Sequence, residues 1–412
     1  MSATATLNPA TETPMPRVAL EKIEATGGPN GSTPSAEPTL GFFQQNLPAN
    51  LILFSFVFLT IPFALCQLFL NHPLVFWTYI WLFGTTHFIV TFVVYFQKRN
   101  LKYFLSSPKN IAIYFVVPAV LFIGFDMLHA FRIGALYPTF ALYFWGAVRL
   151  FDFNHLNRQT FGVYQMFKVR AGVRTTKDLK WCENGYFNSL SALMFVTFLS
   201  GGATPFLLPG GWFQTTFEIQ GLIEPKLPVL TLQFLACAAL ASTFGFLIAS
   251  LVKFKKASVN AGNPDAITPA LLYLLFQSLG AFMAAIYLPL YAAALAIHYV
   301  EYHVLMVPRT LNVPLDETSR LDRAFGRVRS SRIVFYSIVL FISLIATAMS
   351  YAGMGMMGRN PETLTLPFNY LVLISMFDGL FVFHYFVEMF IWRFSDPFYR
   401  QTLSNLYFAP KS

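Results

Sequence analysis

Residues 269–307 read PALLYLLFQSLGAFMAAIYLPLYAAALAIHYVEYHVLMV, an apolar run of 39 residues in which Glu301 is the only residue with a formal charge. A single helix of this length would measure about 58 Å, far more than the ~30 Å hydrocarbon core of a membrane. We therefore predict that the run crosses the membrane twice, as a tight helical hairpin that turns around Ile286–Pro289. A re-entrant segment is the main alternative.

Eight further apolar segments are long enough to span a bilayer. They are Leu51–Leu70, Leu74–Phe96, Ile111–Leu128, Gly134–Phe153, Phe187–Leu208, Leu227–Val252, Ile333–Tyr351 and Phe368–Trp392. With the hairpin as the seventh and eighth spans, the basic clusters follow spans two, four, six and ten and precede span nine. All of them then lie on one side, which predicts ten helices with both termini in the cytosol. The expected fold is an all-α, polytopic membrane helix bundle of a bacterial cytoplasmic (inner) membrane.

The composition supports the same fold class. The chain is 56% hydrophobic and only 11% charged, whereas a soluble protein carries about 25% charged residues. Its formal charge of +9 lies mainly in short loops beside apolar segments, so membrane lipids are the expected partners. We expect no nucleic-acid binding, since no basic face is interleaved with exposed aromatic residues. The three cysteines are far apart and predict neither a disulfide framework nor a Cys-type zinc site.

The domain organisation predicted from the sequence is simple. Residues 1–39 are rich in Ala, Thr, Pro and Gly and are expected to form a disordered cytosolic tail. Residues 40–412 form a single transmembrane domain. Two segments that mix basic and apolar residues, near 154–180 and 314–332, are expected to lie along the membrane surface. The pair Gly201–Gly202 is expected to break or end the fifth helix.

The chain has seven histidines, and five of them are predicted in or just beyond the cytosolic half of a span. They are His87, His155, His298, His303 and His384. Ionisable groups at membrane depth are costly and mark function, and clustered histidines suit metal or haem ligation. We predict that these five hold a metal. The structural alternative for each is an imidazole that only hydrogen-bonds a neighbouring helix.

Carboxylates and an amide stand one helical turn from several of these histidines. The pairs are His384 with Glu388, His298 with Glu301, Asp152 with His155, and His155 with Gln159. Residues at this spacing share a helix face, so each carboxylate can ligate the metal or orient the ring. His303 is five residues from His298, about 140° around the helix. Either one of the two ligates while the other packs, or a local bulge brings them together.

Three stretches also resemble motifs of known membrane proteins. They are His155–Gly162 (HLNRQTFG), His298–His303 (HYVEYH) and Asp378–Arg393, which ends in FIWR. They are similar to motifs in a loosely defined group of polytopic bacterial membrane proteins with a His-x-x-Arg-Gln-x-x-Gly pattern. The general plan resembles the Brp/Blh-type membrane carotenoid oxygenases, in which histidines on several helices hold non-haem iron. The spacing of His298 and His303 departs from that family, and the histidine boxes of fatty-acid desaturases are absent.

These patterns lead to one functional hypothesis, a metal-dependent membrane oxygenase or hydroxylase that acts on a lipophilic substrate. Non-haem iron is the expected metal, because mixed His/carboxylate sites suit oxygen chemistry. Glu301, Glu388 and Asp378 are the candidate catalytic carboxylates. Arg158 and Gln159 are expected with His155 at the cytosolic mouth. No Gly-rich nucleotide loop is present, so electrons would come from a separate donor or from the substrate.

Three other functions fit the same residues. Two histidines could serve as axial ligands of haem in an electron-transfer protein. Asp378, Glu301 and Glu388 could carry protons in a proton-coupled transporter. In a structural membrane partner, the polar groups would only hold helices together.

Overall fold

The computed structural model describes most of the chain after its first 41 residues. The described residues are 42–70, 77–130, 138–210, 226–260, 267–311, 320–329, 331–357, 368–392 and 396–408. All of them belong to one unit, Leu40–Ser412. The predicted disordered tail, residues 1–39, lies outside the described residues, as do residues 314–319 of the second predicted surface segment.

The described residues are almost entirely helical, which confirms the all-α prediction. The longer helices are α1 (Asn46–Ser55), α2 (Ile61–Phe69), α4 (Thr86–Tyr95), α5 (Lys98–Phe104), α7 (Val117–Ala130), α9 (Pro138–Arg170), α10 (Lys177–Leu199), α11 (Val229–Asn260), α12 (Thr268–Ile286), α13 (Tyr291–Thr310), α14 (Arg320–Arg329), α15 (Arg332–Met357), α16 (Phe368–Ile391) and α17 (Pro397–Tyr407). Shorter turns are η1 (Phe42–Gln44), α6 (Pro108–Ile111) and η6 (Leu288–Leu290), together with the π-helical turns η2 (Phe56–Thr60), η3 (Ile80–Thr85) and η4 (Ala112–Val116).

Within the described residues, six helical segments are long and apolar enough to cross a membrane, or seven if a bent pair counts as one span. The six are Asn46–Phe69, Trp77–Tyr95, Val229–Asn260, Thr268–Ile286, Leu288–Thr310 and Arg332–Met349. The bent pair joins Lys98–Phe104 to Pro108–Gly124 at 112°. The protein is therefore a multi-pass helical membrane protein by the length and composition of its helices.

The predicted helical hairpin is confirmed. Helix α12 ends at Ile286, Tyr287 is extended with φ −142° and ψ 106°, and α13 begins at Tyr291 after the short turn η6. The turn is fixed by the loop after α10: the amide of Leu288 donates to the carbonyl of Gly202 at 2.7 Å, and the amide of Thr204 donates to Ile286 at 2.8 Å. A buried turn needs such partners for its backbone groups.

The glycine pair also ends the fifth predicted span, as expected. Helix α10 stops at Leu199, and Gly201 and Gly202 follow with φ values of 86° and 110°. Residues with a Cβ rarely adopt positive φ, so this pair can turn the chain where other residues would resist. The turn brings Gly202 to the hairpin described above.

The structure differs from the prediction after Phe153. Helix α9 does not end there but continues to Arg170. The reason is burial: Leu156, Val163 and Phe167 recur at helical spacing and are at most 3% exposed. They belong to the core cluster that α9 shares with α10 and α12, so this part of the chain is solvated by protein.

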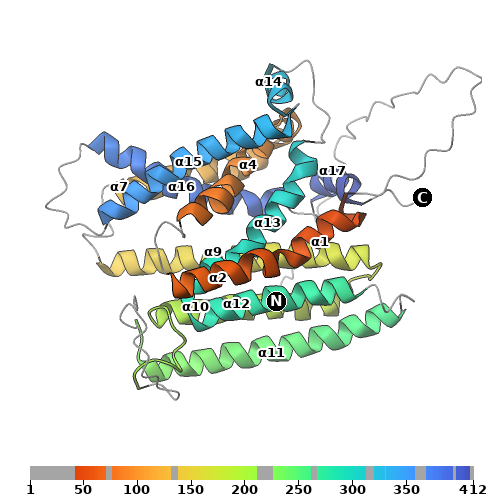
Figure 1. Cartoon of the computed structure of the whole chain (residues 1–412), viewed down its shortest axis with the longest axis vertical. Coiled ribbons are helices and arrows are strands. Elements are labelled where there is room, and N and C mark those ends of the chain that lie inside the picture. Colours follow the sequence, from red (N-terminus) through yellow and green to blue (C-terminus); the bar gives the residue numbers. More distant parts are fainter. Residues whose placement is uncertain are drawn as a thin grey trace, which may run out of the picture. The chain divides into compact units, whose positions relative to one another are not determined.

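Helix α13 occupies the centre of the bundle. It contacts α1, α4, α9, α12 and α17, and Figure 1 shows it running obliquely between the stack of α9 to α12 and the group formed by α4, α7, α15 and α16. Most of its residues are buried. Any polar residue on α13 therefore has to find its partner on a neighbouring helix.

Helices α7 and α16 touch closely at Gly379. A Cβ at this position would lie 2.8 Å from both the backbone oxygen and a ring carbon of Phe122, so Gly379→Ala has to push α16 away from α7. We expect a clear fall in thermal stability, of about 1–3 kcal/mol, measured by heating the detergent-solubilised protein. The control is Gly124→Ala on α7, where a Cβ meets nothing within 4 Å. An equal effect of both changes would contradict the close contact.

Candidate metal centre

Four helices bring four histidines and one glutamate to a single buried point. The residues are His87 on α4, His155 on α9, His298 on α13, and His384 and Glu388 on α16. Their exposed fractions are at most 7%. Before α4, the π-helical turn η3 inserts an extra residue per turn, a feature often found at functional sites. The five residues are separated by up to 301 positions in the chain, so only tertiary packing unites them.

The carboxylate of Glu388 lies between three imidazoles. Its Oε2 atom is 3.0 Å from Nε2 of His155 and 3.5 Å from Nε2 of His384, and its Oε1 atom is 3.8 Å from Nε2 of His87. The Nε2 atoms of His87 and His384 are 2.8 Å apart. Two ring nitrogens at this distance share either a proton or a cation, because two unprotonated lone pairs would repel one another.

His298, on α13, completes the group. Its ring centroid is 4.9 Å from that of His87 and 5.5 Å from that of His155. Of the possible ligands, His87, His384 and Glu388 offer donor atoms that all lie within 4.8 Å of one another, close enough to hold one metal ion. His155 and His298 flank this trio.

Several donor atoms in this group have no hydrogen-bond partner among the described residues. They are Nδ1 of His87, His298 and His384, whereas Nε2 of His155 and Oε2 of Glu388 lie 3.0 Å apart and pair with each other. A buried polar atom without a partner costs about 1–3 kcal/mol. A cation between the imidazoles and the carboxylate would contact Nε2 of His87 and His384 and the oxygens of Glu388, and nitrogen and oxygen donors suit first-row transition metals.

Two residues that sequence reasoning missed support this site. The ring of Tyr302 lies 3.8 Å, centroid to centroid, from that of His87. The hydroxyl groups of Tyr302 and Thr91 are hydrogen-bonded, and the Thr91 hydroxyl is 3.5 Å from Oε1 of Glu388. Both were detectable, because Thr91 is four residues after His87 and Tyr302 is four after His298, which places each on the same helix face as its histidine.

Asp152 reaches the site through an aromatic ring. It accepts hydrogen bonds from Tyr385 at 2.7 Å and from Arg149 at 3.1 Å, and the Tyr385 ring lies 4.8 Å from the ring of His155. Arg149 and Asp152 thus form an ion pair. The pair lies within α9 and not at its end, because the helix continues to Arg170.

Glu301 belongs to a different polar cluster. Its Oε1 atom accepts hydrogen bonds from the hydroxyl of Tyr273, at 2.6 Å, and from the amide of Gln277, both on α12. Within the described part of the chain, no hydrogen bond or ion pair joins it to His298, the residue it was expected to assist. Glu301 therefore ties α13 to α12, and Glu388 is the carboxylate among the imidazoles.

His303 also lies apart from the Glu388 group. Its Nε2 atom is 3.0 Å from the hydroxyl of Thr86 and 3.3 Å from the backbone oxygen of Phe83. The sequence left two arrangements open for His298 and His303. The structure has the one in which His303 packs and His298 joins the cluster, because α13 is α-helical from Tyr291 to Thr310. Asp378, the third candidate carboxylate, lies on α16, and its side chain is outside the described part of the chain.

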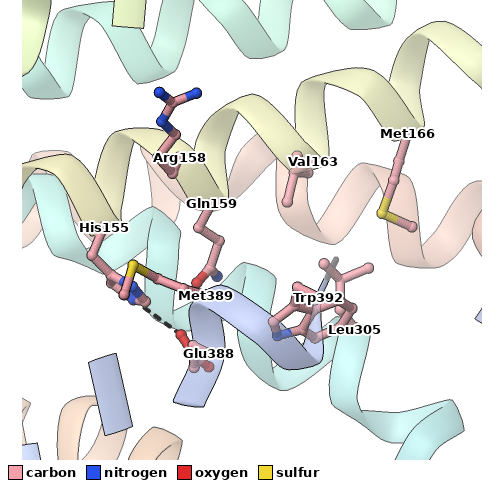
Figure 2. Close-up of a pocket in the computed structure, with 10 residues that line it drawn as sticks. His155, Arg158, Gln159, Val163, Met166, Leu305, Glu388, Met389 and Trp392 are labelled. Carbon is pink, nitrogen blue, oxygen red and sulfur yellow. Dashed lines mark ion pairs between the residues drawn. The ribbon is translucent and has the colours of Figure 1, made fainter. Parts of the chain in front are cut away.

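A cavity of about 140 Å³ adjoins the group. It is lined by His155, Arg158, Gln159, Gly162, Val163, Met166, Leu305, Glu388, Met389 and Trp392. Figure 2 shows His155 and Glu388 facing each other at one end, with Gln159 pointing from α9 toward α16. Arg158 is exposed and donates a hydrogen bond to Asn184 at 2.7 Å. The cavity thus connects the predicted mouth residues with the Glu388 carboxylate.

Comparisons with known proteins give this chain no relative. No family model, curated protein or solved structure matches it.

Proposed function

We propose that this chain is a membrane-embedded, metal-dependent oxygenase or hydroxylase that acts on a lipophilic substrate. The observation that carries the proposal is the convergence of His87, His155 and His384 on the carboxylate of Glu388, with His298 beside them. Mixed histidine and carboxylate sites that leave coordination positions open suit non-haem iron. Bound iron would supply the activation of oxygen.

The chain's own residues have distinct roles in this proposal. His87, His384 and Glu388 hold the metal, and His155 and His298 complete or orient the ligand set. Thr91 and Tyr302 fix the carboxylate from one side. Asp152 holds Tyr385 against the His155 ring, and such outer partners commonly set ligand orientation. The largely apolar cavity beside Glu388 would admit a lipophilic substrate, and electrons would come from a separate donor or from the substrate.

The proposed setting is a bacterial cytoplasmic membrane, with ten spans and both termini in the cytosol. Six of these ten proposed spans, or seven with the bent pair, contain a helix that is long and apolar enough to cross a membrane. The positive-inside rule supports the orientation, because the basic loops then share one side. The Glu388 group would lie in the cytosolic half of the bilayer.

Haem between these histidines is less well supported than a compact metal site. Axial ligands of one haem lie on opposite sides of its iron, about 4 Å apart at metal–nitrogen distances near 2 Å, with the macrocycle between them. The Nε2 atoms of His87 and His384 are 2.8 Å apart, and Glu388 occupies the space beside them. A Soret band in the purified protein would nevertheless overturn the preference for non-haem iron.

Iron content tests the proposal directly. We expect the purified protein to hold about one iron per chain without a Soret band, and His384→Ala to lower iron content by at least about tenfold. His303→Ala is the matched control, because it removes another histidine of α13, a half-buried one that bonds Thr86 instead of facing Glu388, and it should keep its iron. Metal analysis and an absorption spectrum in mild detergent are the measurements.

Two results would count against the oxygenase proposal or its assignment of ligands. A protein that takes up no metal even after incubation with Fe(II) would contradict the oxygenase proposal. Substrate uptake driven by a proton gradient would then favour the transporter alternative, in which Glu301, Glu388 and Asp378 carry protons. Loss of iron in His303→Ala as well as His384→Ala would contradict the assignment of ligands.

A further inference from the structure

Two residues that line the cavity beside Glu388 each carry a buried polar atom that no described residue satisfies. The atoms are Oε1 of Gln159, on α9, and Nε1 of Trp392, directly after α16. Both residues line the cavity, whose other walls include Val163, Met166 and Leu305. Figure 2 shows both side chains extending into the space between α9 and α16. The cavity is thus apolar over most of its wall, and two of its lining residues hold one unpaired acceptor, on Gln159, and one unpaired donor, on Trp392.

The indole of Trp392 is held in place by its neighbours. The guanidinium of Arg309 lies 4.7 Å from the centre of its ring, and the rings of Tyr302 and Tyr407 lie 6.1 and 6.2 Å away. Arg309 itself donates to the backbone oxygen of Ile391 at 3.3 Å. A guanidinium has no acceptor atom, so Arg309 cannot accept the indole N–H. The position of this donor is therefore set before any ligand arrives.

The two atoms define the chemistry of a fitting ligand. An indole N–H can only donate and an amide oxygen can only accept. A hydrocarbon in the cavity would leave both unsatisfied, and an ether or ketone would satisfy only the indole. A hydroxyl group accepts one hydrogen bond and donates another, so it matches both. The cavity volume of about 140 Å³ is several times the ~30 Å³ share of one water molecule, which leaves room for the first carbons of a chain.

We propose that this cavity binds the alcohol end of a single-chain lipophilic molecule, with Trp392 donating to the hydroxyl oxygen and Gln159 accepting its proton. The inference deepens the proposed function, on which it rests for the identity of the site, by naming the substrate class. The hydroxyl-bearing end of the molecule lies beside Glu388, and the hydrocarbon tail leaves past Met389, which is 39% exposed. Binding itself requires neither iron nor oxygen.

The test measures binding of matched probes to the purified full-length chain in lipid nanodiscs. Unlabelled 1-hexadecanol, hexadecyl methyl ether and hexadecane compete against tritiated 1-hexadecanol. We expect the alcohol to bind about tenfold more tightly than the ether, since the ether leaves the Gln159 oxygen unpaired. Hexadecane should bind more weakly still. Equal competition by all three probes would overturn the proposal.

Two variants locate the selectivity. Trp392→Phe and Gln159→Leu should each weaken alcohol binding about tenfold, and Gln159→Leu should bring the alcohol and the ether close together. The matched control is Trp181→Phe, whose indole is 66% exposed on α10 and should leave binding unchanged. Unchanged alcohol affinity in both cavity variants would overturn the assignment.

Repeating the measurement after iron removal by a chelator separates this inference from the proposed function. Selectivity for the alcohol that persists without iron supports the roles of Gln159 and Trp392. Selectivity that vanishes with the iron would assign alcohol binding to the metal and would overturn the roles of Gln159 and Trp392. If the chain holds no iron at all, the proposed function fails, while the comparison of probes still decides this inference.

Discussion

Glu388→Gln is expected to lower the affinity of the purified protein for iron by more than about 100-fold. The amide keeps the shape of the side chain but removes the negative charge that faces His87, His155 and His384 at 3.0–3.8 Å. Loss of an outer-shell partner already costs about 10–100-fold in metal affinity, and Glu388 is placed as a direct ligand. Titration of the metal-free protein with Fe(II) would measure the change.

Glu301→Gln is the matched control for this experiment. Glu301 is also a fully buried carboxylate, but its partners are Tyr273 and Gln277 on α12. We expect its iron affinity to stay within about twofold of the unmodified protein, which is less than one hydrogen bond is worth. Equal loss in both variants would mean that iron is lost through unfolding. Unchanged iron binding in Glu388→Gln would remove Glu388 from the ligand set.

Lys168→Met is expected to destabilise the protein by about 3–5 kcal/mol, because it leaves a buried charge without its partner. The ammonium group of Lys168 on α9 is 2.6 and 2.8 Å from the two carboxylate oxygens of Glu183 on α10. The side chains are at most 1% exposed. Thermal unfolding in detergent, followed by size-exclusion chromatography of the heated samples, would measure the loss.

Two further variants define the cause. The double change Lys168→Met with Glu183→Leu should regain most of the stability, since it removes both buried charges together. Lys253→Met removes the cation of an exposed pair, whose nitrogen and the Asp178 oxygen are 4.0 Å apart, and should cost at most about 1 kcal/mol. A double variant as unstable as Lys168→Met alone would point to lost packing and not to the unpaired Glu183 carboxylate.

The sequence predicted those features of the fold that depend on local composition. The run 269–307 is too long for one span, and the basic clusters share one side only if it crosses twice, so length and loop charge together predicted the hairpin. The end of α10 followed from Gly201 and Gly202, which adopt positive φ. The sequence did not predict that α9 continues past Phe153 to Arg170, because the residues that pack this part of the helix on α10 and α12 lie far away in the chain.

The candidate site was only partly predictable for a geometric reason. His298 and Glu301 are three residues apart, so their side chains point about 60° apart around α13, whereas His298 and Tyr302 differ by about 40°. Because Glu301 and Tyr302 point in different directions around α13, Glu301 meets α12 and Tyr302 meets the His87 ring. Spacing along one helix could propose both as partners of His298, but it could not decide which neighbouring helix each would meet.

The sequence by itself determined that this chain is a helical membrane protein and that its buried histidines and carboxylates require partners, because apolar length and the cost of burying polar groups are local properties. Only the tertiary structure decided which residues meet. Four helices had to pack with specific rotations before His87, His155, His298 and His384 could gather around Glu388. Those rotations result from contacts between residues far apart in the chain, such as Gly379 against Phe122, and no pattern within a single helix records them.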